Sequence, residues 1–83
     1  MDKILVKLYV PMIEEQYDIL IPQNRRIHSI IKLLSKAVYE LTDGYYNPNE
    51  MPTLYDKLSA KPYDYNLLIK DTNIRNGTEI VMI

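Results

Sequence analysis

The strongest constraint on the fold is a single change of hydrophobic period in the first half of the chain. Over residues 3–10 and again over residues 17–22, apolar side chains alternate with others, which is the period of a half-buried β-strand. Pro11 follows the first alternating segment and Pro22 closes the second, with only a short link between the two. We therefore expect an antiparallel hairpin at the start of the fold.

Beyond this hairpin the apolar residues recur three and four positions apart, which is typical of an amphipathic helix. The residues with this spacing are Ile27, Ile30, Ile31, Leu34, Val38 and Leu41. The pattern predicts a helix over about residues 25–41, with Asn24 as its N-cap and Gly44 as the C′ residue that ends it. Such a helix has one apolar stripe, which has to pack on one face of the sheet.

The remainder of the chain contains two further strand candidates. A tyrosine- and proline-rich segment follows the helix, and within it residues 53–58 (TLYDKL) are expected to form a short strand. The turn dipeptide Asn76-Gly77 precedes an apolar final strand. With 83 residues, no repeat and no linker, residues 1–83 are expected to form a single domain.

The charge, cysteine content and hydrophobicity of the chain argue against nucleic-acid binding, disulfide bonds and insertion into a membrane. Ten basic and eleven acidic residues give a net charge of −1, which provides no general attraction for nucleic acid. Arg25-Arg26, at the predicted helix start, is either solvated or a small basic spot for an acidic partner. The absence of cysteine rules out disulfides and suits a reducing compartment. No apolar run approaches the ~20 residues of a spanning helix, so we expect a cytoplasmic protein without direct membrane insertion.

The residues that catalytic and cofactor motifs require are largely missing. With only two glycines, Gly44 and Gly77, the chain cannot build a phosphate-binding or dinucleotide loop. No serine has the surroundings of a catalytic nucleophile, and the single histidine, His28, is predicted to be solvated on the polar side of the helix. The acidic residues are scattered singly or in pairs, so no metal site is predicted. We expect no catalytic residue, no cofactor and no metal, and hence no enzyme.

The predicted order of elements is strand, strand, helix, short strand and final strand. In this order the sequence resembles the ubiquitin-like β-grasp superfamily, and the closing segment NLLIKDTNIRNGTEIVMI (residues 66–83) is the most similar part. The resemblance implies an α+β fold with a mixed sheet of about four strands. It also implies that the last strand enters beside the first and that one helix packs on one face.

More narrowly, two short segments resemble the YukD/EsaB family of small bacterial ubiquitin-like proteins, which are associated with type VII (WXG100) secretion. These segments are YDILIP (residues 17–22), which precedes the isoleucine-rich helix, and IRNGTEIVMI (residues 74–83). The resemblance implies a non-catalytic cytoplasmic protein that binds a protein partner. Its role would be that of an accessory or regulatory component of the secretion machine.

Strict alternation along the strands decides which side chains face away from the core. If Ile4, Val6 and Leu8 face the helix, the residues between them face the other way, and the same parity applies to the second and last strands. We expect an exposed apolar face, with a rim of tyrosine and lysine, that binds a protein partner. The candidate protein-binding residues are Leu5, Lys7, Tyr9, Leu20, Tyr55, Val81 and Ile83.

Other interpretations remain open from the sequence. The tyrosine-rich segment, residues 45–65, could bind a partner, pack on its own domain or fold back over this face, and Ile83 could fray. The chain could also be a homo-oligomeric adaptor unrelated to secretion, such as a homodimer joined through the same face or a strand edge. A covalent modifier or sulfur carrier needs a C-terminal Gly-Gly, whereas this sequence closes with Val81-Met82-Ile83, so we do not expect conjugation.

Overall fold

In the computed structural model, which describes residues 3–83, the amino-terminal hairpin forms as the alternation predicts. Its two strands, β1 and β2, pair antiparallel along their whole length, from Lys3 opposite Pro22 to Val10 opposite Glu15. The elements in chain order are β1 (Lys3–Val10), the short 3-10 helix η1 (Pro11–Ile13), β2 (Glu15–Pro22), α1 (Ile27–Leu41), β3 (Leu54–Asp56), the 3-10 helix η2 (Ile69–Asp71) and β4 (Glu79–Met82).

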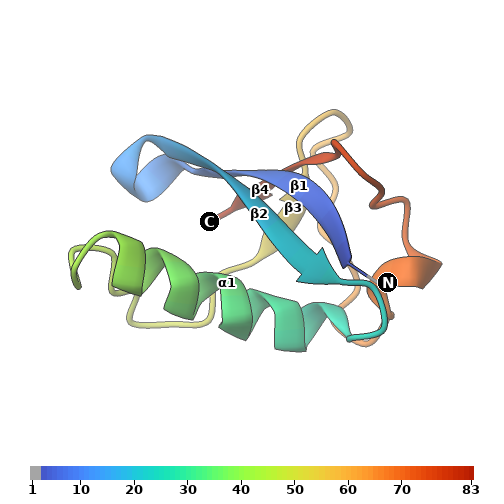
Figure 1. The fold of residues 1–83 in the computed structure, drawn as a ribbon, viewed down its shortest axis with the longest axis horizontal. Helices are drawn as coiled ribbons and strands as arrows, with labels where there is room; N and C mark the ends of the chain where they lie inside the picture. Colours follow the sequence, from blue (N-terminus) through green and yellow to red (C-terminus); the bar gives the residue numbers. More distant parts are fainter. Residues whose placement is uncertain (1–2) are drawn as a thin grey trace.

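The four strands form one mixed sheet in the order β2-β1-β4-β3 (Figure 1). β4 lies parallel to β1, with Ile80 opposite Leu8, and β3 is antiparallel to β4. Figure 1 shows α1 crossing one face of this sheet. The structure therefore confirms the predicted α+β β-grasp architecture, in which the last strand enters beside the first and one helix covers one face.

The helix begins two residues later than predicted, at Ile27, and the prediction that Asn24 is its N-cap is wrong. The N-cap residue is Arg26, whose side chain makes no capping hydrogen bond. Instead, the first backbone N–H groups of the helix donate to a distant segment: Ile27 to the carbonyl of Leu67 at 2.9 Å, and the next residue to that of Tyr65 at 3.1 Å. The free donors of a helix N-terminus need acceptors, and here a tertiary contact supplies them.

At its other end, the helix stops at Leu41 in a Schellman motif. Asp43 N–H donates to the carbonyl of Glu40 at 3.2 Å, and Gly44 N–H donates to that of Tyr39 at 2.8 Å. These bonds make Asp43, with a φ of 53°, the C′ residue, and Gly44, with a φ of 85°, the residue after it. The predicted position of the C′ residue is therefore wrong by one, because Asp43 adopts the left-handed conformation that glycine usually supplies.

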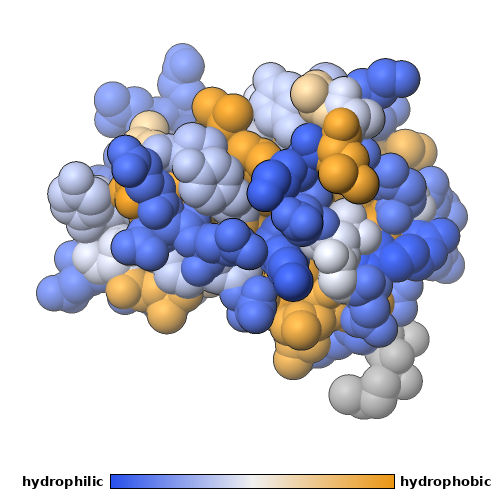
Figure 2. Space-filling model, turned by 90° about the horizontal axis from the view of Figure 1, so that it is seen from above, coloured by the Kyte–Doolittle hydropathy of each residue, from blue (hydrophilic) through white to orange (hydrophobic). Residues whose placement is uncertain are grey.

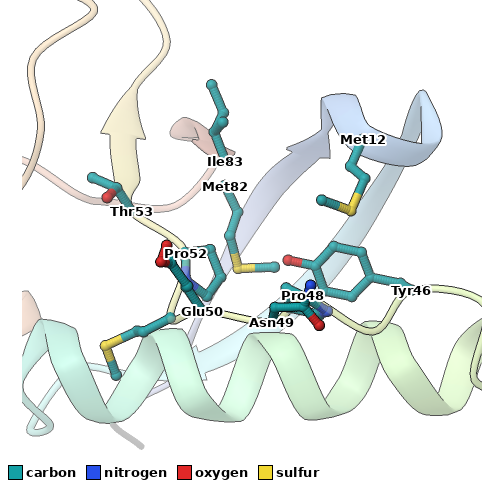
Figure 3. A pocket seen from close by; sticks show the side chains of 10 residues that line it. Met12, Tyr46, Pro48, Asn49, Glu50, Pro52, Thr53, Met82 and Ile83 are labelled. Atoms are coloured by element: carbon teal, nitrogen blue, oxygen red, sulfur yellow. The ribbon is translucent and has the colours of Figure 1, made fainter.

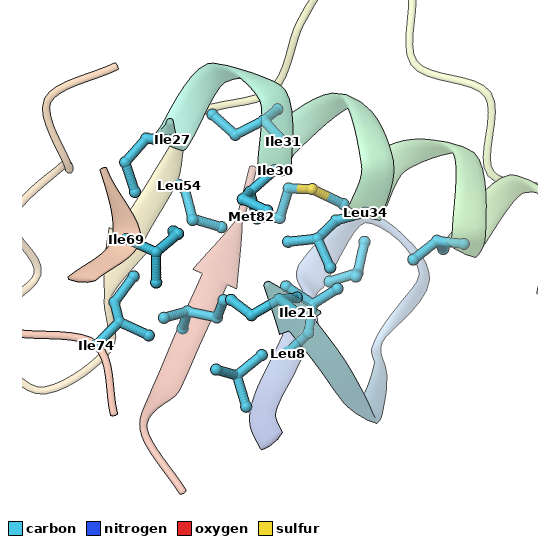
Figure 4. Packing of buried hydrophobic residues seen from close by; sticks show 14 of the residues in the cluster. Leu8, Ile21, Ile27, Ile30, Ile31, Leu34, Leu54, Ile69, Ile74 and Met82 are labelled. Carbon is cyan, nitrogen blue, oxygen red and sulfur yellow. The ribbon is translucent and has the colours of Figure 1, made fainter. Parts of the chain in front are cut away.

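The core lies between α1 and the inner face of the sheet (Figure 4). Alternate residues of β1 and the apolar stripe of α1 are buried there, as their two periods predict. Figure 4 shows these side chains converging from the helix and the sheet, together with side chains from residues 69–74. The buried residues of the cluster are Ile4, Val6, Leu8, Val10, Ile21, Ile27, Ile30, Ile31, Leu34, Val38, Tyr46, Leu54, Ile69, Ile74, Ile80 and Met82.

The tyrosine-rich segment, residues 45–65, is fastened to the rest of the fold by several of its tyrosines. Tyr46 is 1% exposed and belongs to the core, and Tyr63 packs against that core. The hydroxyl of Tyr65 lies 3.3 Å from Thr53 Oγ1. Since large outward side chains of the sheet stay exposed, this segment does not cover the face opposite α1. Of the interpretations open from the sequence, packing onto its own fold is the one that these contacts support.

Candidate interaction surface on the outer face of the sheet

The face of the sheet opposite α1 is made of alternate residues from the strands, because successive side chains of a strand point to opposite faces. The register places all the predicted protein-binding residues on this outer face or directly at its end. They are Leu5 (41% exposed), Lys7 (exposed), Tyr9 (half-buried), Leu20 (58% exposed), Tyr55 and Val81 (half-buried) and Ile83 (66% exposed).

Strand pairing sorts these residues into rows that run across the sheet. Leu5 lies directly opposite Leu20, and these two form the leucine pair at one end of the outer face. In the next row, Lys7 lies opposite Asp18 on β2 and opposite Glu79 on β4. Side chains opposite one another in this way lie about 5 Å apart, so each row is a set of contacting neighbours.

The following row, the tyrosine row, contains Tyr9, Val81 and Tyr55 from three neighbouring strands. Val81 is flanked by the two tyrosines, and such pairs of aromatic and β-branched side chains stabilise a sheet by about 0.2–1 kcal/mol each. Two positions further along, Ile83 exchanges backbone hydrogen bonds with Thr53 in both directions, at 2.7 and 3.0 Å. Ile83 therefore combines a paired backbone with an exposed side chain, which argues against fraying at this residue.

A charged row separates the leucine pair from the tyrosine row. It contains Asp18, Lys7, Glu79 and Lys57, and Lys57 Nζ lies 3.0 Å from Glu79 Oε2. Viewed from above, onto the sheet and away from α1, the hydrophobic surface occurs as separate patches with hydrophilic side chains between them (Figure 2). Lys7 thus lies inside the outer face and not at its rim, and the expected apolar face consists of two apolar groups divided by alternating charges.

A groove that the sequence did not indicate adjoins Ile83 (Figure 3). It has a volume of about 830 Å³, and its lining includes Met12 from η1 and residues 48–53. Figure 3 shows the side chains of Met12 and Met82 close to the ring of Tyr46. The only available signal was the proline and methionine content of these segments, and neither residue type by itself indicates a groove.

A cluster of polar side chains lies beside β3, around the buried carboxylate of Asp56. Ser59 Oγ donates to Asp56 Oδ2 at 2.9 Å and Asn73 Nδ2 donates to the same oxygen at 3.4 Å. These hydrogen bonds, chiefly that from Ser59, hold the pKa of Asp56 below its ordinary value of 3.8. Asn73 Oδ1 accepts a hydrogen bond of 2.8 Å from the hydroxyl of Tyr63. Burial and the nearby charge of Asp56 raise the pKa of Tyr63 to about 12.

This polar cluster ties β3 to the segment before β4, since Asp56 and Asn73 are far apart in the sequence. In the described part of the chain, no buried side-chain polar atom lacks a hydrogen-bond partner. A cluster whose polar groups are satisfied by one another stabilises the local structure and leaves no group aimed at a ligand. We therefore assign it a structural role.

Other chemistry expected or excluded from the sequence can be placed as well. His28 lies in the first turn of α1, with Nδ1 3.5 Å from Ser29 Oγ. It was predicted to be solvated, but it is half-buried. Among residues 3–83, no three histidine, aspartate or glutamate side chains form a group that could hold a metal ion. The same residues include no helix with the length and apolar character needed to span a membrane.

Comparison with known proteins supports the fold. No protein-family model matches the chain, and no curated protein matches its sequence. The solved EccD5 ubiquitin-like domain from Mycobacterium xenopi superposes with a TM-score of 0.80 at 17% identity, covering 100% of this chain and 94% of that one. The ubiquitin-like domain of the Mycobacterium tuberculosis type VII secretion system protein EccD1 gives 0.79 at 10% identity, covering 100% and 99%. A chain from a toluene 4-monooxygenase complex gives 0.77 at 11% identity, covering 96% and 95%.

These similarities establish that the chain has the ubiquitin-like β-grasp fold. At identities of 10–17% they establish the fold alone. The third structure belongs to an enzyme complex, so one fold serves different functions among these neighbours. The function therefore has to be argued from the surface of the chain itself.

Proposed function

We propose that this chain is a non-catalytic ubiquitin-like interaction module that binds a protein partner through the outer face of its sheet. The observation that carries the proposal is the arrangement of the leucine pair and the tyrosine row on either side of the charged row. The opposite face of the same sheet is filled by α1, which leaves the outer face as the exposed surface of the strands.

The composition of this face suits a protein partner. Tyrosine offers a large contact area at a low cost in conformational entropy, and it is enriched at interfaces. The alternating charges of the charged row favour a partner whose own charges match them, which gives orientation and selectivity more than affinity. Because all the rows lie on paired strands, little ordering is needed when the partner binds.

For the partner we propose a protein of a bacterial type VII (WXG100) secretion machine, with this chain acting in the cytoplasm as an accessory or regulatory component. Two observations support this choice. Residues 17–22 and 74–83 resemble the YukD/EsaB family, and the fold superposes on the ubiquitin-like domains of EccD5 and EccD1. The first is a resemblance of sequence and the second a similarity of fold.

Titration calorimetry of the purified chain against purified WXG100 proteins and the cytosolic part of an FtsK-like ATPase tests the proposal. Tyr55→Ala, in the tyrosine row, should weaken binding by about tenfold or more, since truncated interface tyrosines are often hot spots. Tyr45→Ala is the matched control, because Tyr45 is 79% exposed and directly follows the turn at the end of α1. It should leave the affinity unchanged.

The outcomes separate the surface from the identity of the partner. If Tyr55→Ala binds as tightly as the wild type, the outer face is not the binding surface. If Tyr45→Ala loses as much affinity as Tyr55→Ala, the effect is not specific to that face. If none of the secretion proteins binds at all, the proposed partner class is wrong.

A further inference from the structure

The sheet has two edges, and they differ in their unused backbone hydrogen-bonding groups. At the β3 edge, Tyr63 N–H donates to the carbonyl of Leu54 at 2.9 Å and Asp56 N–H donates to that of Lys61 at 3.0 Å, so residues 61–63 cover this edge. At the other edge, β2 runs for eight residues with no further strand beside it in the described part of the chain. β2 is therefore the place where another strand can be added.

The hydrogen bonds of β1 show which groups of β2 are free. Lys7 N–H donates to the carbonyl of Thr78 at 2.9 Å, and the carbonyl of Leu5 accepts from Gly77 N–H at 2.7 Å. The odd-numbered residues of β1 thus point their backbone groups towards the β4 side. Since hydrogen-bonded and non-hydrogen-bonded pairs alternate in an antiparallel ladder, the residues opposite them point theirs to the open edge. These residues are Gln16, Asp18, Leu20 and, with a carbonyl but no N–H, Pro22.

We propose that β2 pairs antiparallel with β2 of a second copy of this chain, with Leu20 on the two-fold axis. In this register the two Leu20 residues exchange both of their backbone hydrogen bonds. Asp18 N–H of each copy also meets the carbonyl of Pro22 of the other. The pairing joins the two four-stranded sheets into one continuous sheet, and it does not depend on which protein the outer face binds.

The side chains of the outer face favour this register. Leu20 lies opposite Leu5 within one copy, so pairing at Leu20 makes a continuous row of four leucines across the two copies. A register with Asp18 on the axis places two carboxylates opposite each other, which is destabilising. A register with Ile19 on the axis places the carboxylate of Asp18 against the apolar side chain of Leu20.

The bounds of β2 set the length of this pairing. β2 ends at Pro22, and Arg25 lies in the bend that leads to α1, so pairing at Leu20 joins residues 18–22 of the two copies. Because the interface has two-fold symmetry, every contact across it occurs twice.

The flank of α1 on the β2 side adds apolar surface. The flank of α1 that carries Ser35 lies towards β4, because Ser35 Oγ is 3.8 Å from Met82 Sδ. Leu33 and Leu41 project from the flank opposite to Ser35, on the β2 side, where they are 40% and 63% exposed. A two-fold axis perpendicular to the sheet brings the same flank of a second helix to this side, so these leucines gain apolar neighbours.

Light scattering of the full chain over a range of concentrations tests the association. We expect a dimer, with twice the 9.8 kDa mass of one chain at the upper end of the range. Leu20→Asp should weaken the dimer by about tenfold or more, because it places two carboxylates opposite each other on the axis. Leu33→Asp, which puts a charge on the apolar flank of α1, should weaken it as well. Leu58→Asp, at a leucine that is 92% exposed in the turn after β3, is the matched control and should have no effect.

Single-cysteine variants test the register, since the natural chain has no cysteine. Two Leu20 residues paired on the axis have Cα atoms about 5.5 Å apart, which is within the range of a disulfide. Leu20→Cys should therefore form a disulfide-linked dimer on mild oxidation. Gln16→Cys is the matched control on the same edge of the same strand, because its counterpart lies far along the paired strand. It should not form a cross-link.

Three results would overturn the proposal. The first is a monomer at every concentration up to about 1 mM, which leaves no specific association. The second is a dimer that Leu20→Asp and Leu33→Asp leave intact, which requires another surface. The third is cross-linking of Gln16→Cys without cross-linking of Leu20→Cys, which requires another register. Circular dichroism of each variant checks that it is folded, and if a Leu20 variant fails to fold, Leu33→Asp and the mass of the wild type still decide the outcome.

Discussion

Asp56→Asn is the substitution that most directly tests the polar cluster beside β3. Asp56 is 9% exposed, and its Oδ2 accepts hydrogen bonds from Ser59 and Asn73. Asparagine keeps the shape but replaces one oxygen by an NH2 group, which cannot accept. If the NH2 group takes the place of Oδ2, it faces the amide donor of Asn73; if the oxygen keeps that place, both hydrogen bonds lose their charged acceptor.

The expected cost follows from the number and type of these bonds. A hydrogen bond to a charged group contributes about 1.5–3 kcal/mol, and a buried donor left without an acceptor adds its own desolvation penalty. We expect Asp56→Asn to lower the free energy of unfolding at neutral pH by about 2 kcal/mol. Urea unfolding followed by circular dichroism measures this, and Glu50→Gln, which removes an exposed charge, is the control.

The pH dependence of the difference in free energy of unfolding between wild type and Asp56→Asn tests whether hydrogen bonds to the ionised carboxylate cause it. The folded state lowers the pKa of Asp56 below 3.8, so near that pH the unfolded chain binds more protons than the folded one. The stability that Asp56 supplies is thus fully present above the unfolded pKa and is lost as the pH falls through the folded pKa. The difference between wild type and Asp56→Asn should be largest above about pH 5 and should shrink below about pH 3. An equal difference at both ends of this range would refute the reasoning.

Five other changes have expected outcomes. Leu34→Ala, in the core, should lower the free energy of unfolding by about 2–5 kcal/mol, and Leu33→Ala, on a more exposed side of α1, by less than about 1 kcal/mol; urea unfolding measures both. Gly77 has a φ of 84°, and no atom lies within 4 Å of an added Cβ, so Gly77→Ala should lower the free energy of unfolding by about 1 kcal/mol through backbone strain alone. Ala60→Gly, at a φ of 60°, should raise it by a similar amount, and thermal unfolding measures both. The pKa of Tyr63 is raised from its ordinary value of 10.0 to about 12, so the stability that the protonated hydroxyl supplies should be lost as the pH rises from 10.0 through about 12. Tyr63→Phe should remove this contribution to the loss of stability at alkaline pH.

The parts of the fold that depend on local periodicity were predictable from the sequence. The strand over residues 3–10 and the apolar stripe of the helix follow from side-chain spacing alone, because each spacing fits one backbone geometry. The β-grasp order also followed, since a helix after a hairpin has to cover one face. Outward parity of Leu5, Leu20 and Val81 was predictable for the same reason.

The parts that depend on contacts between distant residues were not predictable. The acceptors for the first turn of α1 come from Leu67 and Tyr65, so no pattern near Asn24 could have identified them. The charged row depends on the pairing of β1 with β4, which sets Lys7 opposite Glu79; parity gives the face of a residue but not its neighbours. The groove at Ile83 depends likewise on how residues 48–53 return along the fold.

The two proposed surfaces make a joint prediction, because they overlap only at the leucine pair: the dimer is joined at Leu20 on β2, whereas the tyrosine row lies on β1, β4 and β3. A two-fold axis through Leu20 and perpendicular to the sheet leaves Val81 two strands away from the interface, on the same side of the dimer in both copies. Val81→Ser should therefore weaken binding of the protein partner without changing the mass of the dimer. Leu33→Asp, on α1 and away from the outer face, should favour a monomer whose single site keeps its affinity in solution but dissociates faster from an immobilised partner, since bivalence is lost. Surface plasmon resonance measures the dissociation, and loss of both properties in either folded variant would mean that one surface serves both.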